Sequence, residues 1–437
     1  WDKTANTTRL NLYQPTPFGI IKATGYYGRE SRDRRYPAYI NTKNPQAGIY
    51  DASWETIFWQ YGARIEYEIA YAKEHTTTAA FDYEGLDDGI GRAPSYNLFA
   101  YKRKNRVNIM AGVLQHRWEI SKTMDLTAGL RYEDVSIVIS NFSTSSYYPY
   151  ITGRNKWIKR HWAGIIPKSF VTFKFDKIAE VMRDTSVSIG VSRVWHAPDY
   201  HGTYNPQGRP AGAWLHNEDG VGYDFIAMRR IWSKVTLQAR YYLYDIKNYL
   251  ANNGSMSRFS GKNAPVGFEY KDYVVNLERV CRHGIEVNLG GETIKGLSFY
   301  TSYTYQELRY KGRSPLNRIT AKIELGGQAK HLFKAGIRYL LSHTGTCFMA
   351  DYGYRSEELF TNPKKVAADA YLFYITKIRP HHLLDVAIEQ TILKDKYYFK
   401  NLRIKFFIKN ILNDIYQSEE GYQMPGRTFG GEIGMKF

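Results

Sequence analysis

Apolar and polar residues alternate with a period of two along most of the chain, in segments of about ten residues. In 126–132 every second residue is apolar or Ala, and Arg131 lies between two of them. Segment 402–408 repeats the pattern, with Arg403 and Lys405 at intervening positions. Because neighbouring side chains of a strand point to opposite faces, each segment is predicted to have one apolar and one charged face.

The alternation predicts about 17 strands. They are expected at 6–13, 18–28, 52–59, 63–72, 106–119, 124–134, 165–175, 186–195, 222–231, 234–246, 275–290, 296–307, 330–341, 345–355, 382–391, 399–409 and 427–437. Short turns are expected at 15–17, 121–122, 231–234, 291–296, 342–345 and 394–396. Long polar connections are expected near 29–53, 74–104, 136–163, 196–220, 247–273, 308–329, 356–380 and 411–426.

Segments of this length with a charged second face are typical of tilted strands that cross a bilayer around a wet lumen. Alternating short and long connections are typical of outer-membrane barrels. Tyr and Trp gather near segment ends, where an aromatic girdle is expected; examples are Trp195, Tyr241, Tyr242 and Tyr244. The predicted fold is therefore all-β, an antiparallel transmembrane β-barrel, and the alternative is a large soluble β protein.

Composition narrows the class further. The chain has 437 residues, 16% of them aromatic, which excludes a disordered chain. Its two cysteines exclude a disulfide scaffold and a four-cysteine zinc module. No run of 18 apolar residues occurs, and the mean hydropathy of −0.49 excludes a helical membrane protein. The net charge is +18, but the basic runs are short, as at 101–104, which argues against nucleic-acid binding.

Several motifs carry a family resemblance. Ile408–Tyr416 (IKNILNDIY) is followed by Gly421–Thr428 (GYQMPGRT) and a terminal aromatic residue, Phe437. Further fragments occur upstream at 126–132, 166–168, 195–200, 215–224 and 276–286. In this order they resemble the TonB-dependent outer-membrane receptors from about residue 105 to the C-terminus, and 1–104 is compatible with them. Two departures, His196 for the usual Arg and Asn217 for the usual Pro, argue against transferring ligand residues from the family.

The resemblance implies a barrel of about 22 strands around an N-terminal plug domain. We expect 1–437 to be the outer-membrane barrel domain, without the plug, the TonB-box segment and about five N-terminal strands. The chain begins at Trp1 without a leader, so we expect a processed, trimmed or incomplete chain, or one half of a split receptor. A plugless porin is the less favoured explanation.

The resemblance also implies a function. We expect TonB-dependent uptake of a scarce nutrient across the outer membrane of a Gram-negative bacterium, foremost a ferric siderophore, otherwise haem or cobalamin. Phe437 would be the outer-membrane assembly signal. The expected partners are membrane lipid, lipopolysaccharide, and the TonB complex acting through the plug. The alternatives are a plugless porin and a structural barrel subunit of an outer-membrane complex.

After the receptor and the porin or structural subunit, the third class of function to consider is an outer-membrane enzyme. No phosphate loop, zinc-protease motif or serine-hydrolase motif occurs, and no nucleophile–base pair can be assembled, so we expect no catalytic residues. No resident metal or cofactor is expected. Cys281 and Cys347 lie on strands that are not neighbours in the predicted order, so a bridge between them is not expected.

Candidate binding residues cluster in one long connection. Members of the resembled family that bind haem have a histidine in the interval around His201, which gives His196, Tyr200, His201, Trp214 and His216 as substrate-binding candidates; ordinary surface histidines are the alternative. Side chains expected to face the lumen are Arg282, Glu286, Asp385 and Glu389. Basic residues expected in long loops would attract an anionic chelate or contact lipopolysaccharide phosphates. These are Arg29, Arg32, Arg34, Arg35, Lys102, Arg103, Lys104, Lys364 and Lys365.

Overall fold

The backbone is extended in nearly all of the residues that the structure describes. A computed structural model describes residues 2–40, 49–89, 101–143, 156–175, 182–198, 215–232, 234–252, 274–313, 325, 327–367, 370–396, 399–419 and 422–436. In these residues the strands form one antiparallel sheet of 17 strands and two separate two-stranded sheets. None of the described segments is a helix of sufficient length and apolarity to cross a bilayer.

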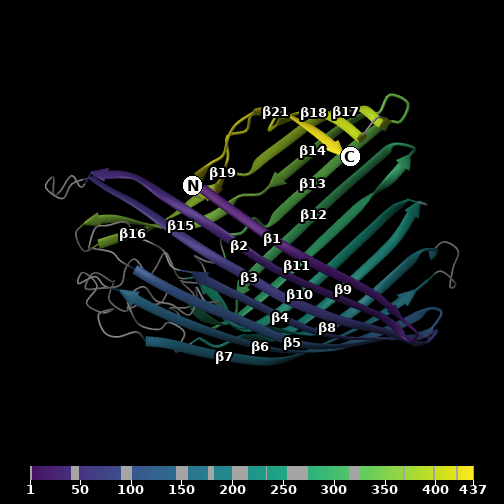
Figure 1. Cartoon of the computed structure of the whole chain (residues 1–437), viewed down its shortest axis with the longest axis horizontal. Helices are drawn as coiled ribbons and strands as arrows, with labels where there is room; N and C mark the ends of the chain where they lie inside the picture. Colours follow the sequence, from purple (N-terminus) through teal and green to yellow (C-terminus); the bar gives the residue numbers. More distant parts are fainter. Residues whose placement is uncertain are drawn as a thin grey trace.

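The large sheet follows the order of the chain. Its strands are β1 (Asp2–Thr16), β2 (Gly19–Ile40), β3 (Ile49–Ala72), β4 (His75–Gly89), β5 (Tyr101–Ser121), β6 (Met124–Ser143), β7 (Lys156–Lys174), β8 (Thr185–His196), β9 (Glu218–Trp232), β10 (Val235–Asn252), β11 (Val274–Ile294), β12 (Leu297–Tyr310), β13 (His331–Leu341), β14 (Thr346–Arg355), β17 (His381–Lys396), β18 (Phe399–Lys409) and β21 (Thr428–Lys436). Each pairs with its neighbour in this series, and Figure 1 shows the sheet curled. β15 (Glu358–Ala367) pairs with β16 (Ala370–Ile378), and β19 (Gln417–Glu419) with β20 (Tyr422–Gln423).

The two ends of the sheet differ in their connections. At one end, here the short-turn end, β1 joins β2 through two residues, and β3 joins β4 in the same way. Gly296 and Gly345 lie in such turns with φ of +85° and +71°, where a side chain would be strained. The predicted turn at 342–345 is thus confirmed, whereas the turn predicted at 291–296 is shorter, because β11 runs to Ile294 and only 295–296 connect it to β12. The β15–β16 hairpin projects at the opposite, long-connection end (Figure 1).

The two faces of the sheet differ in chemistry. One, here the apolar face, carries large hydrophobic side chains that stand exposed on successive strands. They include Ile65, Phe81, Leu114, Ile165, Ile189, Phe225, Tyr241, Ile285, Ile337, Phe348, Ile388, Phe406 and Ile433. The other, here the polar face, carries Lys, Arg, Asp, Glu and Tyr. A sheet that exposes a continuous apolar band on one side and charges on the other suits lipid outside and water inside.

Aromatic rings mark both edges of the apolar band. At the short-turn end the rings of Tyr71, His75 and Trp118 stack, with centroids 5.6 and 5.7 Å apart for the two pairs made by His75. At the long-connection end Tyr354 lies 4.9 Å from His382. Aromatic belts at two levels fit the two interfaces of a membrane.

The membership of these belts corrects part of the sequence prediction. Tyr241 lies on the apolar face as expected, 44% exposed. Tyr242 is 3% exposed and belongs to the polar face with Tyr244, because both pack against Arg240. Trp195 is 8% exposed, packed with Val135 and other residues of a small apolar cluster. Position near a strand end therefore does not place an aromatic ring in a belt, because the face of the strand decides its environment.

The predicted number of strands equals the 17 strands of the large sheet, but several predicted elements are wrong. The predicted connections 356–380 and 411–426 contain the short strands β15, β16, β19 and β20. The predicted strands 52–59 and 63–72 are parts of the single strand β3, and the predicted connection 74–104 contains β4. Strands also run further than predicted at the long-connection end, so the stretches around Arg29 and Lys102 lie in β2 and β5 rather than in loops. Lys364 lies in β15, a strand of the separate two-stranded sheet. The same correction holds for Arg32, Arg34, Arg35, Arg103, Lys104 and Lys365.

Candidate functional site on the polar face of the sheet

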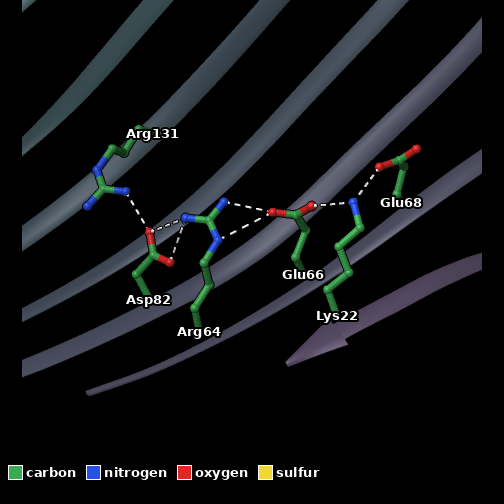
Figure 2. Close-up of polar contacts among 6 residues, drawn as sticks. All are labelled: Lys22, Arg64, Glu66, Glu68, Asp82 and Arg131. Carbon is green, nitrogen blue, oxygen red and sulfur yellow. Dashed lines mark hydrogen bonds and ion pairs between the residues drawn. The ribbon is translucent and has the colours of Figure 1, made fainter. Parts of the chain in front are cut away.

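A chain of ion pairs crosses the polar face of the first strands. Lys22 on β2 contacts Glu66 and Glu68 on β3, with Nζ 3.2 and 2.9 Å from the carboxylate oxygens. Arg64 bridges Glu66 and Asp82 at 2.8 and 2.9 Å. Figure 2 shows these residues in one line, which ends at Arg131 on β6. We call Lys22, Arg64, Glu66, Glu68, Asp82, Arg131 and Glu133 the charge ladder.

The last step of the charge ladder passes over a whole strand. Arg131 on β6 reaches Asp82 on β4, with Nη1 2.7 Å from Oδ2. Ala111 of β5 lies directly across from Asp82 and is only 1% exposed. Its methyl group leaves room for the guanidinium to pass. Arg131 also holds Glu133 on its own strand at 2.7 Å.

A second cluster joins β9, β10 and β11. Arg240 donates to Asp224 at 2.6 Å, and that carboxylate is 7% exposed. The guanidinium also donates to the hydroxyl of Tyr244 at 2.7 Å and contacts Glu286 at 3.4 Å. Arg240 and Arg282 lie against the ring of Tyr242, 5.3 and 5.8 Å from its centroid. The charges here are held by several partners at once, so their positions are fixed.

Glycines of the polar face make room for aromatic rings of neighbouring strands. A Cβ atom on Gly284 would lie 2.5 Å from the hydroxyl of Tyr242, and one on Gly222 would lie 2.6 Å from the ring of Tyr244. The same ring-over-glycine arrangement recurs along the sheet. It is made by Tyr26 with Gly62, Phe170 with Gly190, Tyr300 with Gly336 and Phe407 with Gly430.

The four residues predicted to face the lumen all lie on the polar face with these clusters. Glu286 joins the Arg240 cluster, and Arg282 covers the ring of Tyr242. Glu389 on β17 lies 3.7 Å from Arg403 on β18. Asp385 has a structural partner instead, because its Oδ1 accepts the backbone N–H of Asn410 at 2.7 Å.

That contact gives a physical reason for the motif at 408–416. Asn410 is 5% exposed and has φ of +50°, a conformation that Asn tolerates better than most residues. Its side chain donates to the carbonyl of Asp414 at 2.9 Å and accepts the N–H of the same residue at 3.0 Å. Asn413 in turn accepts the N–H of Arg427 at 2.9 Å. The motif therefore closes the connection after β18 and fixes where β21 begins.

Two of the predicted binding histidines, His196 and His216, lie at the long-connection end. His196 ends β8 directly across from Glu218, which begins β9. His216 lies just before β9, and its backbone N–H and C=O both bond to the side chain of Asn276 on β11, at 2.8 and 2.9 Å. Both imidazoles are exposed. Tyr200, His201, Trp214 and Phe437 lie outside the described residues.

The charge ladder itself was not foreseen in the sequence. Asp82 fell in a predicted connection, although Ala79, Phe81 and Tyr83 alternate with Ala80, Asp82 and Glu84 as they do in other strands. That alternation was the available signal. Among the described residues no group of three or more His, Cys, Asp or Glu side chains is placed to hold a metal ion.

The two cysteines are free, as predicted. Cys347 on β14 is buried on the polar face, where its Sγ accepts from Nε of Arg338 at 3.0 Å. Cys281 lies on β11, which is not a neighbour of β14.

Most charges described on the polar face are paired with charges of the opposite sign. The charge ladder has three cations and four carboxylates joined in one series. A wall of paired charges tolerates water and passing polar solutes, and its fixed charges can hold a second protein surface by exchanging partners.

Comparison with known proteins gives the family. Residues 1–411 match the model of the TonB dependent receptor-like β-barrel. No curated protein matches the chain by sequence.

Among solved structures, the ferric-catecholate import receptor Fiu from E. coli K12 aligns with a TM-score of 0.67 and 12% identity, over 98% of this chain and 63% of that one. The ferric yersiniabactin uptake receptor FyuA from Yersinia pestis aligns with a TM-score of 0.66 and 10% identity, over 99% of this chain and 61% of that one. The copper transporter OprC aligns with a TM-score of 0.66 and 13% identity, over 99% of this chain and 65% of that one.

At these identities the likeness shows the fold alone. The chain spans less than two thirds of the length of each of these three proteins. Because the family model covers nearly the whole sequence, the family itself is shown: the chain belongs to the TonB-dependent receptor β-barrels.

Proposed function

We propose that the chain is the barrel portion of an outer-membrane receptor that takes up a scarce nutrient with energy supplied by the TonB complex. The observation that carries this proposal is the family match over residues 1–411, joined to a sheet with one apolar and one charged face. The localisation that follows is the outer membrane of a Gram-negative bacterium, and the function is transport rather than catalysis.

A ferric siderophore is the proposed substrate, with haem or cobalamin as the other candidates. The solved relatives support a metal-containing cargo, since two import ferric chelates and one is named as a copper transporter. The net charge of +18 supports an anionic one, because a cationic surface raises the local concentration of anionic chelates.

We place first contact with the substrate at the long-connection ends of β8 and β9. His196 and His216 are exposed there, and the side chain of Asn276 fixes the backbone of His216. His201, Tyr200 and Trp214 belong to the same interval of sequence and are part of this proposal. Neutral imidazole can ligate haem iron, and aromatic rings can stack on a planar ligand.

The partner that couples this barrel to TonB is proposed to be a plug domain within the lumen. The charge ladder supports this role, because a wall of paired charges can exchange internal partners for those of a protein surface lying against it. Glu286, Arg282 and Glu389 would belong to the same wall.

Growth assays test the function. The receptor is expressed in a Gram-negative strain that lacks its own iron receptors and receives ferric siderophores, haem or cobalamin as the limiting nutrient. Growth on one of these nutrients that disappears when TonB is deleted is the expected result. Growth that is independent of TonB, together with ion conductance in planar bilayers, would point instead to a plugless channel.

Haem binding separates the substrate candidates. Haem is titrated by its absorbance into the purified receptor and into the variants His201→Ala, His196→Ala and His216→Ala. Loss of the haem spectrum in His201→Ala, with His343→Ala in a short turn unchanged, would identify haem as the cargo. An unchanged spectrum would remove the haem proposal at this interval and leave the siderophore.

A further inference from the structure

A groove lies on the apolar face where the hydrophobic band gives way to charge. It has a volume of about 780 Å³ and is formed by β7 to β11. Most of its lining residues belong to the apolar face: Pro167, Ser169, Val191, Arg193, Asp219, Val221, Asp245, Lys247 and Arg279. It lies toward the long-connection end, because Asp219 is the second residue of β9 and Lys247 is near the end of β10.

The rows of side chains across these strands change character in steps. Phe225, Tyr241 and Ile285 lie directly across from one another and are all exposed to the lipid side. Six residues further along, Asp219, Lys247 and Arg279 form the corresponding row. At about 3.4 Å per residue the two rows are about 20 Å apart. The charged row is only about 7 Å beyond Val221, the last exposed apolar side chain on β9.

Two ion pairs line the groove, and the third cation beside them, Lys247, is not part of either pair. Arg193 binds Asp219 with two bonds of 2.7 and 2.8 Å, and Nη1 of Arg193 also donates to the carbonyl of Ile165 at 2.8 Å. Arg279 binds both oxygens of Asp245. Lys247 lies directly across from Asp219 and Arg279, is exposed, and pairs with neither carboxylate.

We propose that this groove binds the phosphate-bearing headgroup of a membrane lipid in the leaflet at the long-connection end. Lys247 would contact the phosphate, with the guanidinium edges of Arg193 and Arg279 beside it. The apolar walls of Pro167, Val191 and Val221 would contact the first acyl carbons. This inference rests on the proposed function in one respect, namely that the apolar face meets lipid.

The occupant is argued from charge and depth. On the apolar face the lining of the groove has three cations, Arg193, Lys247 and Arg279, against two carboxylates, so its surplus charge is positive and suits a phosphate. Its charged row stands directly outside the apolar band, which is the depth of a headgroup rather than of a soluble ligand. An arginine or lysine in this position binds anionic lipid through its charge while its alkyl stem lies along apolar surface.

Native mass spectrometry tests the proposal. The receptor is reconstituted in nanodiscs that contain equal amounts of phosphorylated lipid A and the same lipid without phosphates, and the lipids retained after release are counted. The wild type is expected to retain the phosphorylated form in preference. Lys247→Gln should lower that preference about fivefold or more, since one charge-assisted contact is lost.

Lys234→Gln is the matched control. Lys234 directly precedes β10 at the short-turn end, far from the groove, and pairs with Glu292. Its retention should equal that of the wild type. Equal retention of both lipids by the wild type would overturn the proposal, as would an equal loss in both variants.

Two further arms separate the sources of failure. Inorganic pyrophosphate at millimolar concentration should leave the retained lipid unchanged, and its displacement of the lipid would identify free phosphate as the ligand instead. Uptake of the limiting nutrient is measured for the wild type and for Lys247→Gln in the strain used for the growth assays. A wild type that prefers the phosphorylated lipid but shows no TonB-dependent uptake would leave this proposal standing and reject the transport function. A wild type with TonB-dependent uptake but without that lipid preference would reject this proposal and leave the transport function standing.

Discussion

Arg131 pairs with Asp82 although the whole of β5 lies between their strands. The contact of 2.7 Å depends on Ala111, the small residue over which the guanidinium passes. The charge ladder is therefore continuous across β3 to β6 only because one position in the intervening strand has a side chain no larger than a methyl group.

Replacing Ala111 with Leu should break the ladder. The larger side chain would occupy the space over β5, separate Arg131 from Asp82, and lower the free energy of unfolding by about 1–3 kcal/mol through overpacking. Urea unfolding in detergent micelles, followed by tryptophan fluorescence, measures the change. Ala79→Leu is the control, because Ala79 is exposed on the apolar face of β4. Equal losses in the two variants would refute the role of Ala111.

Removing the side chain of Asn410 should destabilise the last strands. Asn410→Ala deletes two hydrogen bonds and places Ala at φ of +50°, so we expect a loss of about 2 kcal/mol in the same unfolding assay. Asn410→Gly keeps the backbone conformation and should lose less. Asn288→Ala, an exposed position on β11, should be neutral. If Asn410→Ala were also neutral, the motif at 408–416 would need another explanation.

Replacing a glycine with alanine should lower the free energy of unfolding on the polar face but not on the apolar face. In Gly284→Ala the new Cβ atom would meet the backbone oxygen of Tyr305 at 2.4 Å, so stability should fall by about 1–3 kcal/mol. Gly112 has no atom within 4 Å of the same position, and Gly112→Ala should be neutral or stabilising by up to about 1 kcal/mol. The urea midpoints of the two variants decide, and a shift of the same sign would contradict the argument.

The contact between His381 and Tyr416 should weaken in acid. His381 begins β17 beyond the apolar band, is 7% exposed, and stacks on Tyr416 with ring centroids 4.6 Å apart. Burial lowers the pKa of His381, the guanidinium of Arg355 adds to this, and the carboxylates of Asp414 and Glu358 oppose it. The folded chain therefore prefers the neutral ring, whereas the unfolded chain takes up a proton at about pH 6.5.

Stability from this neutral ring is present above the unfolded pKa and is lost as the pH falls through about 6.5. The free energy of unfolding should thus decline more steeply from pH 7 toward pH 5 in the wild type than in His381→Gln. Parallel pH profiles for the two proteins would count against the assignment. His343→Gln, in an exposed turn, should follow the wild type.

Alternation predicted most of the sheet because it reports directly which face meets lipid. It failed at 60–62, the gap between the predicted strands 52–59 and 63–72, where β3 is continuous and Gly62 lies. The structure gives a reason for this glycine, since a Cβ atom there would collide with the ring of Tyr26. β4 was missed because Thr76, Thr78, Asp87 and Asp88 resemble loop composition, yet they occupy the polar face or the strand end.

The outer parts of the strands could not be predicted from the apolar pattern. Beyond the membrane both faces meet water, so the alternation fades while the backbone pairing continues, as between Arg34 of β2 and Trp54 of β3. The same limit applies to the candidate site. Which residues share a face can be inferred from spacing, but the partner of Asp385 is a backbone N–H 25 residues away, and only folded geometry gives it.

The rings that lie over glycines have a consequence for how this sequence can change through evolution. Tyr242 and Gly284, or Tyr300 and Gly336, fill one space from two strands. A larger residue in place of the glycine is acceptable only if the ring across from it becomes smaller, so neither position can drift alone. In an alignment of homologues these pairs should therefore covary, and they would fix the strand register more firmly than the hydrophobic positions, which lipid lets vary freely.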